Sequence, residues 1–577
     1  MRAKAPLPTF LLVLALAAPG LARAEEPAAQ ADEPAAAAPD EASGEKRLDD
    51  VEKKVARDRL NFTGEIRVAN DFIRGTQPAH FDGMALQKSI VDTLFYVRTN
   101  GAMPGFGSGA GAGALSGSAA GQPQPSLASV LQSNIAAHYS DYLYFLSQLS
   151  FRDLQAAMAS FPPEMRQALM QMLLPGAARA ARDYDNSILY TTRLRLNMGA
   201  DINEHLSFAG RLSMYKTWGD SAGVQVFNGA PTSMNIDGTS TSVPNSDAIR
   251  VDRAYFDWKR IADTGLYLSV GRRPSSSGPP LEIRDNRLRG GTPLGHVVDF
   301  QFDGVTAGYV FDSEKVPGLI VRFCYGLGYE SGFGSGAELR APADRLQDVH
   351  FGGLNLDLYS TDRMFVQATA LRAWRVTDGF NGLVVMPVDP VSGNPAPGPA
   401  VMRYTPSANL GDIDLAALLV ERHDGPLHAF ASLAGMKTHP NGTTTPFGGL
   451  LSDPFSVPES HTAWSAYAGV RWDVAKTSTQ LGFEYNHGSQ YWFNFTQAAD
   501  DIVGSKLSTR GNAYEAYLSQ VIGRNLALRL SGIKYDNEYS GSGWHVGEPK
   551  RLDSMPILGF PTYSDVWNVR LAATVRF

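Results

Sequence analysis

The last twelve residues, VWNVRLAATVRF (566–577), alternate between large apolar side chains and polar or small ones. Trp567, Val569 and Leu571 fall on one face of an extended chain, and Asn568 and Arg570 fall on the other. Successive side chains of a β-strand point to opposite faces, so the pattern predicts a strand with one apolar and one polar face. A chain that repeats this pattern must build a sheet between an apolar and a polar environment.

The same period recurs sixteen times between residue 61 and the C-terminus. The connections alternate between short turns, such as 201–204 and 523–524, and long loops. An even strand number with short turns at one end and long loops at the other is typical of a bacterial outer-membrane barrel. The expected fold class is all-β, a transmembrane antiparallel β-barrel of about sixteen strands, with strands at 61–74, 187–200, 204–218, 247–259, 265–273, 301–311, 318–330, 347–359, 363–377, 410–423, 426–438, 462–474, 478–491, 510–522, 525–538 and 563–577.

The N-terminal region divides into three parts by composition. Residues 1–24 have the basic start, apolar centre and small-residue cleavage site of a secretory signal peptide. Residues 25–45 are rich in Ala, Pro and Glu, which is typical of a disordered linker. Residues 46–60 carry apolar residues at helical spacing, which predicts a short periplasmic helix. This helix is either a coiled coil that sets an oligomer such as a homotrimer or a solvated spacer, since it is short for a coiled coil.

Composition excludes several classes of protein. The formal net charge is −7 and no long basic tract occurs, so nucleic acid is not expected as a partner. Cys324 is the only cysteine, which excludes a disulfide framework and a covalently attached haem. The mature chain has no run of 18 apolar residues, which excludes spanning helices but not spanning strands. No cofactor or metal is expected, because no phosphate-binding loop and no clustered Cys and His residues occur.

One stretch resembles an esterase motif. Gly219–Gly223 reads GDSAG and matches G-x-S-x-G, which would make Ser221 a nucleophile. That motif needs a helix directly after the serine, and residues 224–238 have no helical pattern. We therefore expect no catalytic residue and no enzymatic activity.

The tryptophans support a membrane barrel. Seven of the eight lie near the end of a predicted strand, where interfacial aromatic girdles form. Trp544 alone lies within a predicted loop. The seven are Trp218, Trp258, Trp374, Trp464, Trp472, Trp492 and Trp567.

The first long connection, residues 75–186, is too long for an ordinary loop. Residues 139–160 and 163–174 are predicted to be helical, with Pro162 and Pro163 at the start of the second helix. Both helices are markedly apolar, so they should bury a face against the barrel, its mouth or a neighbouring subunit. The insertion is expected to cap or partly plug the pore, or else to form a surface lobe.

Residues 271–291, GRRPSSSGPPLEIRDNRLRGG, hold five arginines and two acids in a turn-rich segment. The segment follows the fifth predicted strand and so forms the third external loop. Clustered arginines need water, acids or a ligand. The functional interpretation is a pore constriction, and the alternative is that the acids pair with two arginines and stiffen the loop. The residues concerned are Arg272, Arg273, Glu282, Arg284, Asp285, Arg287 and Arg289.

A barrel of about sixteen strands is wide enough for an aqueous channel, whose wall should be polar. Strand parity places more arginines than acids on that wall. The set predicts a mild preference for anions, or alternatively a mixed-charge ladder that only solvates and stiffens the wall. The arginines are Arg193, Arg195, Arg211, Arg253, Arg322, Arg471 and Arg529.

A resemblance extends these expectations. The final strand ending in Phe577 resembles the assembly signal of bacterial outer-membrane barrel proteins, which implies the barrel-assembly machinery as a partner. The signal peptide, periplasmic helix, barrel and the block 271–304 together resemble an uncharacterised family of outer-membrane porins over residues 46–577. In sixteen-stranded general porins, which the architecture resembles, the third external loop folds inward and narrows the channel.

The expected protein is an outer-membrane porin, surrounded by membrane lipid, that lets small hydrophilic solutes or ions diffuse passively. The sequence leaves two alternatives open: a surface anchor or adhesin, and a sheath around a partner protein.

Overall fold

The structure is a computed structural model that describes residues 60–104, 126–149, 151–219, 244, 246–331, 346–379, 382–388, 395–404, 406–497, 500–560 and 562–577. The predicted signal peptide, the linker and residues 46–59 of the predicted helix lie outside these ranges, as does Ser221. Leu60, placed at the end of that helix, begins the first strand instead.

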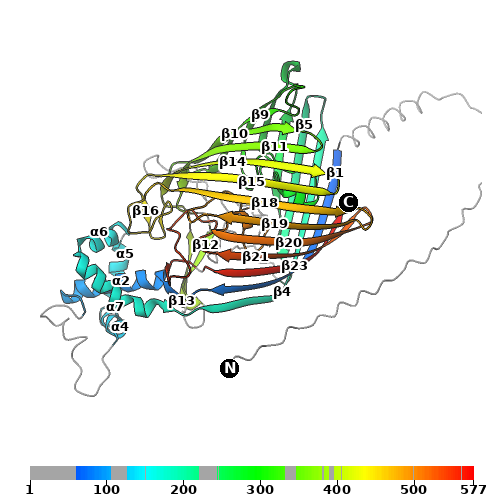
Figure 1. Ribbon diagram of the computed structural model, residues 1–577. Helices are drawn as coiled ribbons and strands as arrows, with labels where there is room; N and C mark the ends of the chain where they lie inside the picture. Colours follow the sequence, from blue (N-terminus) through cyan, green and yellow to red (C-terminus); the bar gives the residue numbers. More distant parts are fainter. Residues whose placement is uncertain are drawn as a thin grey trace, which may run out of the picture. The chain divides into compact units, whose positions relative to one another are not determined.

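Sixteen antiparallel strands form one closed barrel, as the sequence predicts (Figure 1). Neighbours along the chain pair with each other, and the first strand closes the ring against the last. Each predicted segment has a counterpart, and the alternation of one apolar and one polar face explains why. The strands are β1 (Leu60–Gln77), β4 (Arg182–Asp201), β5 (Leu206–Thr217), β6 (Ser246–Trp258), β7 (Leu266–Arg272), β8 (Asp303–Val310), β9 (Ile320–Tyr329), β10 (Val349–Ser360), β11 (Met364–Thr377), β14 (Asn409–Asp424), β15 (Leu427–Pro440), β18 (Thr462–Val474), β19 (Thr479–Gly488), β20 (Gly511–Ile522), β21 (Leu526–Asn537) and β23 (Asp565–Arg576).

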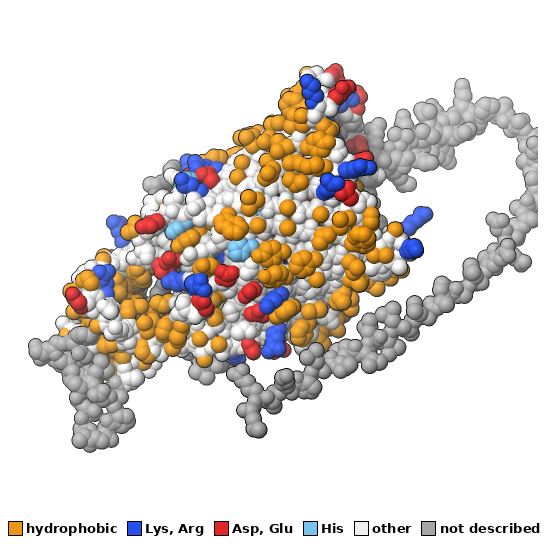
Figure 2. Space-filling view, viewed as in Figure 1, with side chains coloured by type: hydrophobic (Ala, Val, Ile, Leu, Met, Phe, Trp, Pro, Cys, Tyr) orange, Lys and Arg blue, Asp and Glu red, His pale blue; other side chains and the backbone are white. Residues whose placement is uncertain are grey.

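The two faces of the barrel wall differ in polarity. On β23, Val569 and Leu571 are 42% and 54% exposed on the outside, whereas Asn568 is 4% exposed on the inside. Figure 2 shows hydrophobic side chains spread over the strand wall, with most of the charged ones toward its two ends. Apolar side chains on the outside of a closed barrel face a medium that cannot hydrogen-bond, which is the hydrocarbon of a bilayer.

The seam between the first and last strands closes around a glycine. Gly64 N donates to Phe577 O at 2.6 Å, and Phe577 N donates to Gly64 O at 3.0 Å. A Cβ on Gly64 would lie 2.3 Å from the Phe577 ring, so only glycine lets the ring lie against the backbone there. The C-terminal aromatic ring therefore covers the closing seam.

We call the two ends of the barrel the short-turn end, which holds turns such as 202–205 and 523–525, and the long-loop end. Helices gather at the long-loop end, in the insertion between β1 and β4 (Figure 1). The predicted helix at 139–160 is two helices, and the one at 163–174 extends to Ala177. The elements are β2 (His80–Asp82), α2 (Gly83–Asn100), α4 (Leu127–Ala137), α5 (Tyr139–Gln148), α6 (Phe151–Ser160), α7 (Pro163–Ala177) and β3 (Ala178–Arg179).

Helices α2, α6 and α7 bury apolar faces on one another, whereas α5 leaves Tyr139, Leu143, Tyr144 and Leu146 exposed. Leu86 and Ile90 of α2 pack with Leu154 of α6 and with Leu169 and Leu173 of α7 in one cluster. The insertion is tied to other loops, because β2 also pairs with β22 (Ile557–Leu558) and the Gln155 amide donates to Thr444 Oγ1 at 2.7 Å. Within the described ranges, no helix is both long and apolar enough to cross a bilayer.

Small elements complete the loops. Two short sheets form, from β12 (Gly382–Val388) with β13 (Pro395–Tyr404) and from β16 (Thr444–Thr445) with β17 (Gly448–Gly449). The remaining helical turns are η2 (Ile261–Asp263), α8 (Leu281–Asp285) and η4 (Lys506–Ser508).

Part of the lumen holds an apolar core, which the sequence analysis did not predict. Two loops enter the barrel: loop A, residues 273–302 between β7 and β8, and loop B, residues 489–497 and 500–510 between β19 and β20. Leu294 and Val297 of loop A and Trp492 of loop B are fully buried with Ile413 and Leu419 of the β14 wall.

The prediction that Trp492 belongs to an interfacial girdle is therefore wrong, since the residue is 0% exposed inside the barrel. The predicted strand 478–491 ends earlier, at Gly488, because the chain turns inward there. Trp218, Trp258, Trp464, Trp472 and Trp567 are each about half exposed on the outside, as a girdle requires.

Candidate lumen constriction

Loop A carries the arginine-rich segment across the lumen. Its backbone doubles back on itself: Thr292 N donates to Pro274 O at 2.9 Å, and Gly295 N donates to Pro279 O at 2.7 Å. A Cβ on Gly278 would lie 1.8 Å from Pro293 O, so the two limbs can approach only at glycine. Leu281 and Ile283 of α8 are buried, which anchors the short helix and directs the charged side chains beside it.

The arginines of loop A meet acids from distant parts of the chain. Arg284 Nη1 lies 3.0 Å from Asp501, and Arg287 Nη2 lies 2.6 Å from Glu65 on β1. Arg289 Nη1 lies 3.1 Å from Asp357 on β10. The sequence analysis gave pairing of the two acids with arginines of the segment as the alternative to a constriction; within the segment, Arg284 pairs with Asp285 at 3.3 Å.

Arg272 and Arg273 stay closer to the barrel wall. Arg272 ends β7 and pairs with Asp303 on β8 at 3.2 Å. Arg273 Nε donates to Ser269 Oγ at 3.0 Å, and its Nη1 donates to Thr306 Oγ1. The predicted constriction set therefore divides into two wall residues and five residues, 282–289, that project into the lumen.

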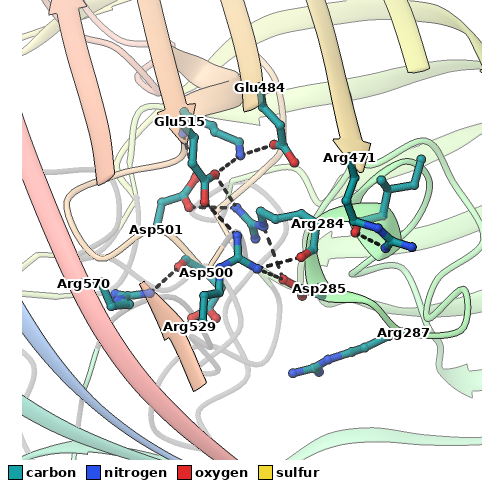
Figure 3. Close-up of polar contacts among 12 residues, drawn as sticks. Arg284, Asp285, Arg287, Arg471, Glu484, Asp500, Asp501, Glu515, Arg529 and Arg570 are labelled. Carbon is teal, nitrogen blue, oxygen red and sulfur yellow. Dashed lines mark hydrogen bonds and ion pairs between the residues drawn. The ribbon is translucent and has the colours of Figure 1, made fainter. Parts of the chain in front are cut away.

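Loop B supplies the other half of an ionic network, shown in Figure 3. Lys506 Nζ donates to both Glu484 and Glu515, and Arg529 Nη2 lies 3.0 Å from Glu515. Arg284 reaches the same group, with Nη1 at 3.6 Å from Glu515. Loops A and B are thus joined to strands β19, β20 and β21 by alternating charges.

Asp500 of loop B binds the opposite wall. Its carboxylate accepts from Arg67 on β1 and from Arg193 Nη1 on β4, the latter at 2.6 Å. Its backbone carbonyl accepts from Arg570 on β23 at 3.1 Å. Although burial opposes ionisation, Arg193 and Arg67 hold the pKa of Asp500 well below its ordinary range, so it remains charged. The sequence analysis did not identify this role of Asp500.

Two acids of loop A have raised pKa values. Burial, reinforced by the Glu421 carboxylate, raises the pKa of Glu282 to about 8. Burial also raises the pKa of Asp299 to about 6. Asp285 behaves differently: burial is outweighed by Arg284 and Arg287, which hold its pKa below the ordinary range.

The predicted wall arginines all face the interior, and six of the seven form one of two kinds of contact. Some hold the loops: Arg253 donates to Ser276 O at 3.0 Å, Arg471 to Ile283 O at 2.6 Å and Arg529 to Arg284 O at 2.6 Å. Arg193 joins them through Asp500.

Others pair along the wall. Arg211 lies 2.5 Å from Asp252, and Arg322 lies 2.8 Å from Asp357. Arg195 is 6% exposed and, in the described part of the chain, has no hydrogen-bond or ion-pair partner. An unpaired buried guanidinium is costly and therefore marks a place where an anion would be stabilised.

A polar recess of about 320 Å³ leads from the short-turn end to these loops. It begins at the β20–β21 turn beside Arg524 and ends at Arg284, Asp285 and Asp500. Seven arginines and four acids line it, a formal balance of +3: Arg67, Arg284, Arg287, Arg524, Arg529, Arg570 and Arg576 against Asp285, Asp500, Asp501 and Glu515.

A closed antiparallel barrel with an apolar outer face and a charged interior is a transmembrane β-barrel of the bacterial outer membrane. The chain belongs to the family described as "Protein of unknown function (DUF3373)", whose model matches residues 183–577. Among curated proteins, none matches this chain.

Three solved structures that match this chain have low sequence identity to it. The trimer form of OmpT from Vibrio cholerae is 12% identical, with 68% of this chain and 93% of that chain covered and a TM-score of 0.34. OmpF of Salmonella typhi, in complex with daunomycin, is 10% identical, with coverages of 69% and 92% and a TM-score of 0.36. OprB of Pseudomonas putida at high pH is 9% identical, with coverages of 92% and 97% and a TM-score of 0.37.

Proposed function

We propose that the protein is an outer-membrane channel for small hydrophilic solutes or ions, with a preference for anions. The observation that carries this proposal is the arginine-rich recess at the short-turn end, which reaches loops A and B. A recess with excess positive charge and low-dielectric walls concentrates anions and repels cations.

Loops A and B form the narrow part of the proposed pathway. Arg287 lies at its edge, 28% exposed, and remains open to the recess while it pairs with Glu65. Arg195 adds an unpaired positive charge to the same side of the wall. Passive diffusion needs no chemistry, which accords with a site composed of ion pairs rather than of a nucleophile and its base.

The sheath alternative has less support. A partner protein inside the barrel needs an empty lumen, whereas Leu294, Trp492 and Phe495 of the two loops pack against the β10–β18 wall. The anchor or adhesin alternative uses the same fold and remains the main competitor.

Planar lipid bilayers with a salt gradient test the proposal. We expect discrete conductance steps and a reversal potential of the sign that anion selectivity produces. The magnitude of this reversal potential should be smaller in Arg287→Gln. The matched control is Arg551→Gln, an exposed arginine of the β21–β23 loop, which should leave the reversal potential unchanged. Cation selectivity that is the same in wild type and Arg287→Gln would overturn the anion preference. Well-folded protein without conductance would favour the anchor.

A further inference from the structure

A second, larger cavity of about 730 Å³ lies at the long-loop end, between the helical insertion and the barrel mouth. Helices α2, α6 and α7 form one side, through Met84, Met158 and Met170. Loop B and the β21–β23 loop form the other side. The recess at the short-turn end reaches loop B at Asp500–Ile502, while this cavity reaches it at Val503–Ser505, so loop B separates the two.

The walls of this cavity are largely apolar. The rings of Phe447 and Phe560 stack with centroids 5.4 Å apart, and those of Trp544 and Phe560 stack at 5.8 Å. Methionines face these rings from the helices. Methionine and aromatic side chains adapt to flat or flexible apolar bodies, and a pathway for water and small ions has no need of such a surface.

One buried arginine in the cavity wall, Arg510, has no acidic partner among the described residues. Arg510 of loop B is 1% exposed and donates only to backbone carbonyls: Nε to Trp492 O at 2.8 Å, Nη1 to Ser540 O at 2.9 Å, and Nη2 to Trp544 O. No carboxylate of the described residues lies within ion-pair distance of it. Burial lowers the pKa of Arg510 to about 9, which still leaves the guanidinium charged at neutral pH. A guanidinium has five N–H groups, so two are not used by these bonds.

The other charges that line the cavity do not neutralise Arg510. Lys550 Nζ lies 2.7 Å from Asp453, so these two form their own pair. Glu548 lies beside that pair, and its pKa is raised by burial and by Asp453. Arg166 of α7 is exposed at the edge. The net effect is an apolar chamber with an uncompensated positive charge at its base.

We propose that this cavity binds a small amphipathic organic anion, with an aromatic or aliphatic body against the Met and aromatic walls and a carboxylate or sulfonate toward Arg510. The apolar walls stabilise the body by removing it from water. Because Arg510 is 1% exposed, an anionic head on the adjoining cavity wall would supply the counter-charge that Arg510 lacks across a short distance rather than by direct contact. This site is separate from the proposed ion pathway and recognises a different chemical class.

A pair of fluorescent probes tests both parts of the proposal on the full-length protein in lipid nanodiscs. 8-Anilinonaphthalene-1-sulfonate carries the negative head, and N-phenyl-1-naphthylamine has the same aromatic body without it. After subtraction of empty nanodiscs, we expect saturable binding of both probes, with the sulfonate about tenfold tighter or more, the change expected for a negative charge held close to a buried cation.

Two variants and one control separate head from body. Arg510→Gln should remove the preference for the sulfonate and leave binding of the neutral probe unchanged. Gly559→Trp should weaken both probes, because Gly559 lines the cavity and a Cβ there meets open space. Ala156→Trp, on an exposed position of α6 outside the lining, should change neither.

Heat-modifiable migration on a gel verifies that each variant is folded. If Arg510→Gln does not fold, weaker probe binding by Gly559→Trp than by wild type still shows that the cavity is a binding site. The difference in affinity of wild type for the two probes then measures the preference for a negative charge. Binding no greater than that of empty nanodiscs, or equal binding by wild type and Gly559→Trp, would overturn the proposal. Equal affinity of wild type for the two probes would overturn the part of the proposal that requires an anionic head group.

Discussion

Arg195 and Arg211 lie on neighbouring strands and face the same lumen, but their surroundings differ. Arg211 Nε lies 2.5 Å from Asp252, a buried carboxylate, so its charge is compensated. Arg195 is just as buried and lies opposite Ser213 and Glu65 in the register, without a bond to either. At the residue scale, the two arginines therefore differ in what their removal should do.

Arg195→Gln should fold as well as wild type or better and should lower anion preference in a reversal-potential measurement. No direct ion pair is lost, because Arg195 interacts with Asp252 and Glu65 only at longer range, and a buried charge without a hydrogen-bonded partner is removed. Arg211→Gln is the matched control: it leaves Asp252 buried without its cation and should cost about 3–5 kcal/mol of stability. Equal loss of heat-resistant gel migration in the two variants would contradict this distinction.

Glu282 makes stability depend on pH. Its pKa is about 8 in the folded protein, compared with an ordinary 4.5. Below pH 4.5 the carboxyl is neutral in both states. Between pH 4.5 and 8 the unfolded chain releases the proton while the folded chain keeps it, so the free energy of unfolding falls as pH rises through this window.

Glu282→Gln should remove that dependence. Relative to the variant, wild type should lose thermal stability from pH 5 to pH 8, measured as the temperature at which the folded band disappears from a gel. Glu204→Gln, at an exposed acid of a short turn, should follow wild type. Parallel curves for wild type and Glu282→Gln would show that Glu282 is ionised in the fold.

At the element scale, the two lumen loops differ in how far the sequence predicted them. Loop A could be placed because arginines, prolines and glycines cluster directly after a recognisable strand. Loop B could not, because Tyr491, Phe493 and Phe495 alternate with other residues and look like the continuation of β19. The acids that pair with loop A were equally hidden, since they lie far away in sequence, as Glu65 and Asp501 do.

Asp500→Asn should loosen loop B. The change keeps the shape of the side chain but leaves Arg67 and Arg193 facing each other without the shared carboxylate. Breaking a buried pair costs about 3–5 kcal/mol, and here that loss lowers the free energy with which loop B docks on the barrel wall. We expect larger and more variable single-channel conductance.

Asp553→Asn provides the matched control, because Asp553 pairs with Arg551 on an exposed loop at 2.6 Å. An exposed surface pair contributes little to stability, so the conductance of Asp553→Asn should equal that of wild type. If both variants conduct as wild type does, Asp500 does not hold the constriction.

At the scale of the whole molecule, the strand pattern alone was enough to predict the barrel. Each strand must present apolar side chains to lipid at every second position, and this pattern can be recognised within each strand segment of the sequence. The content of the lumen is not local, because it depends on which loop residues meet which wall. Ile413 and Leu419 of β14, which face inward against loop A, break the polar-inside expectation for this reason.

Closure of the ring should depend on Phe577. Phe577→Ser should lower the yield of heat-modifiable barrel in outer-membrane fractions several-fold, because the ring covers the seam at Gly64 and ends the predicted assembly signal. Phe62→Ser removes a similarly exposed ring from β1, 59% against 63%, and should have a smaller effect. Equal yields from the two variants would leave Phe577 without a special role.

The pairing of Asp500 with Arg67 has a consequence for the order of events during folding. The two residues are 433 positions apart, and Arg67 lies on β1, which closes the ring against β23. Contacts of such separation carry the greatest loop-closure entropy and form late. In kinetic terms, we expect the docking of Asp500 on Arg67 to be among the late steps of folding.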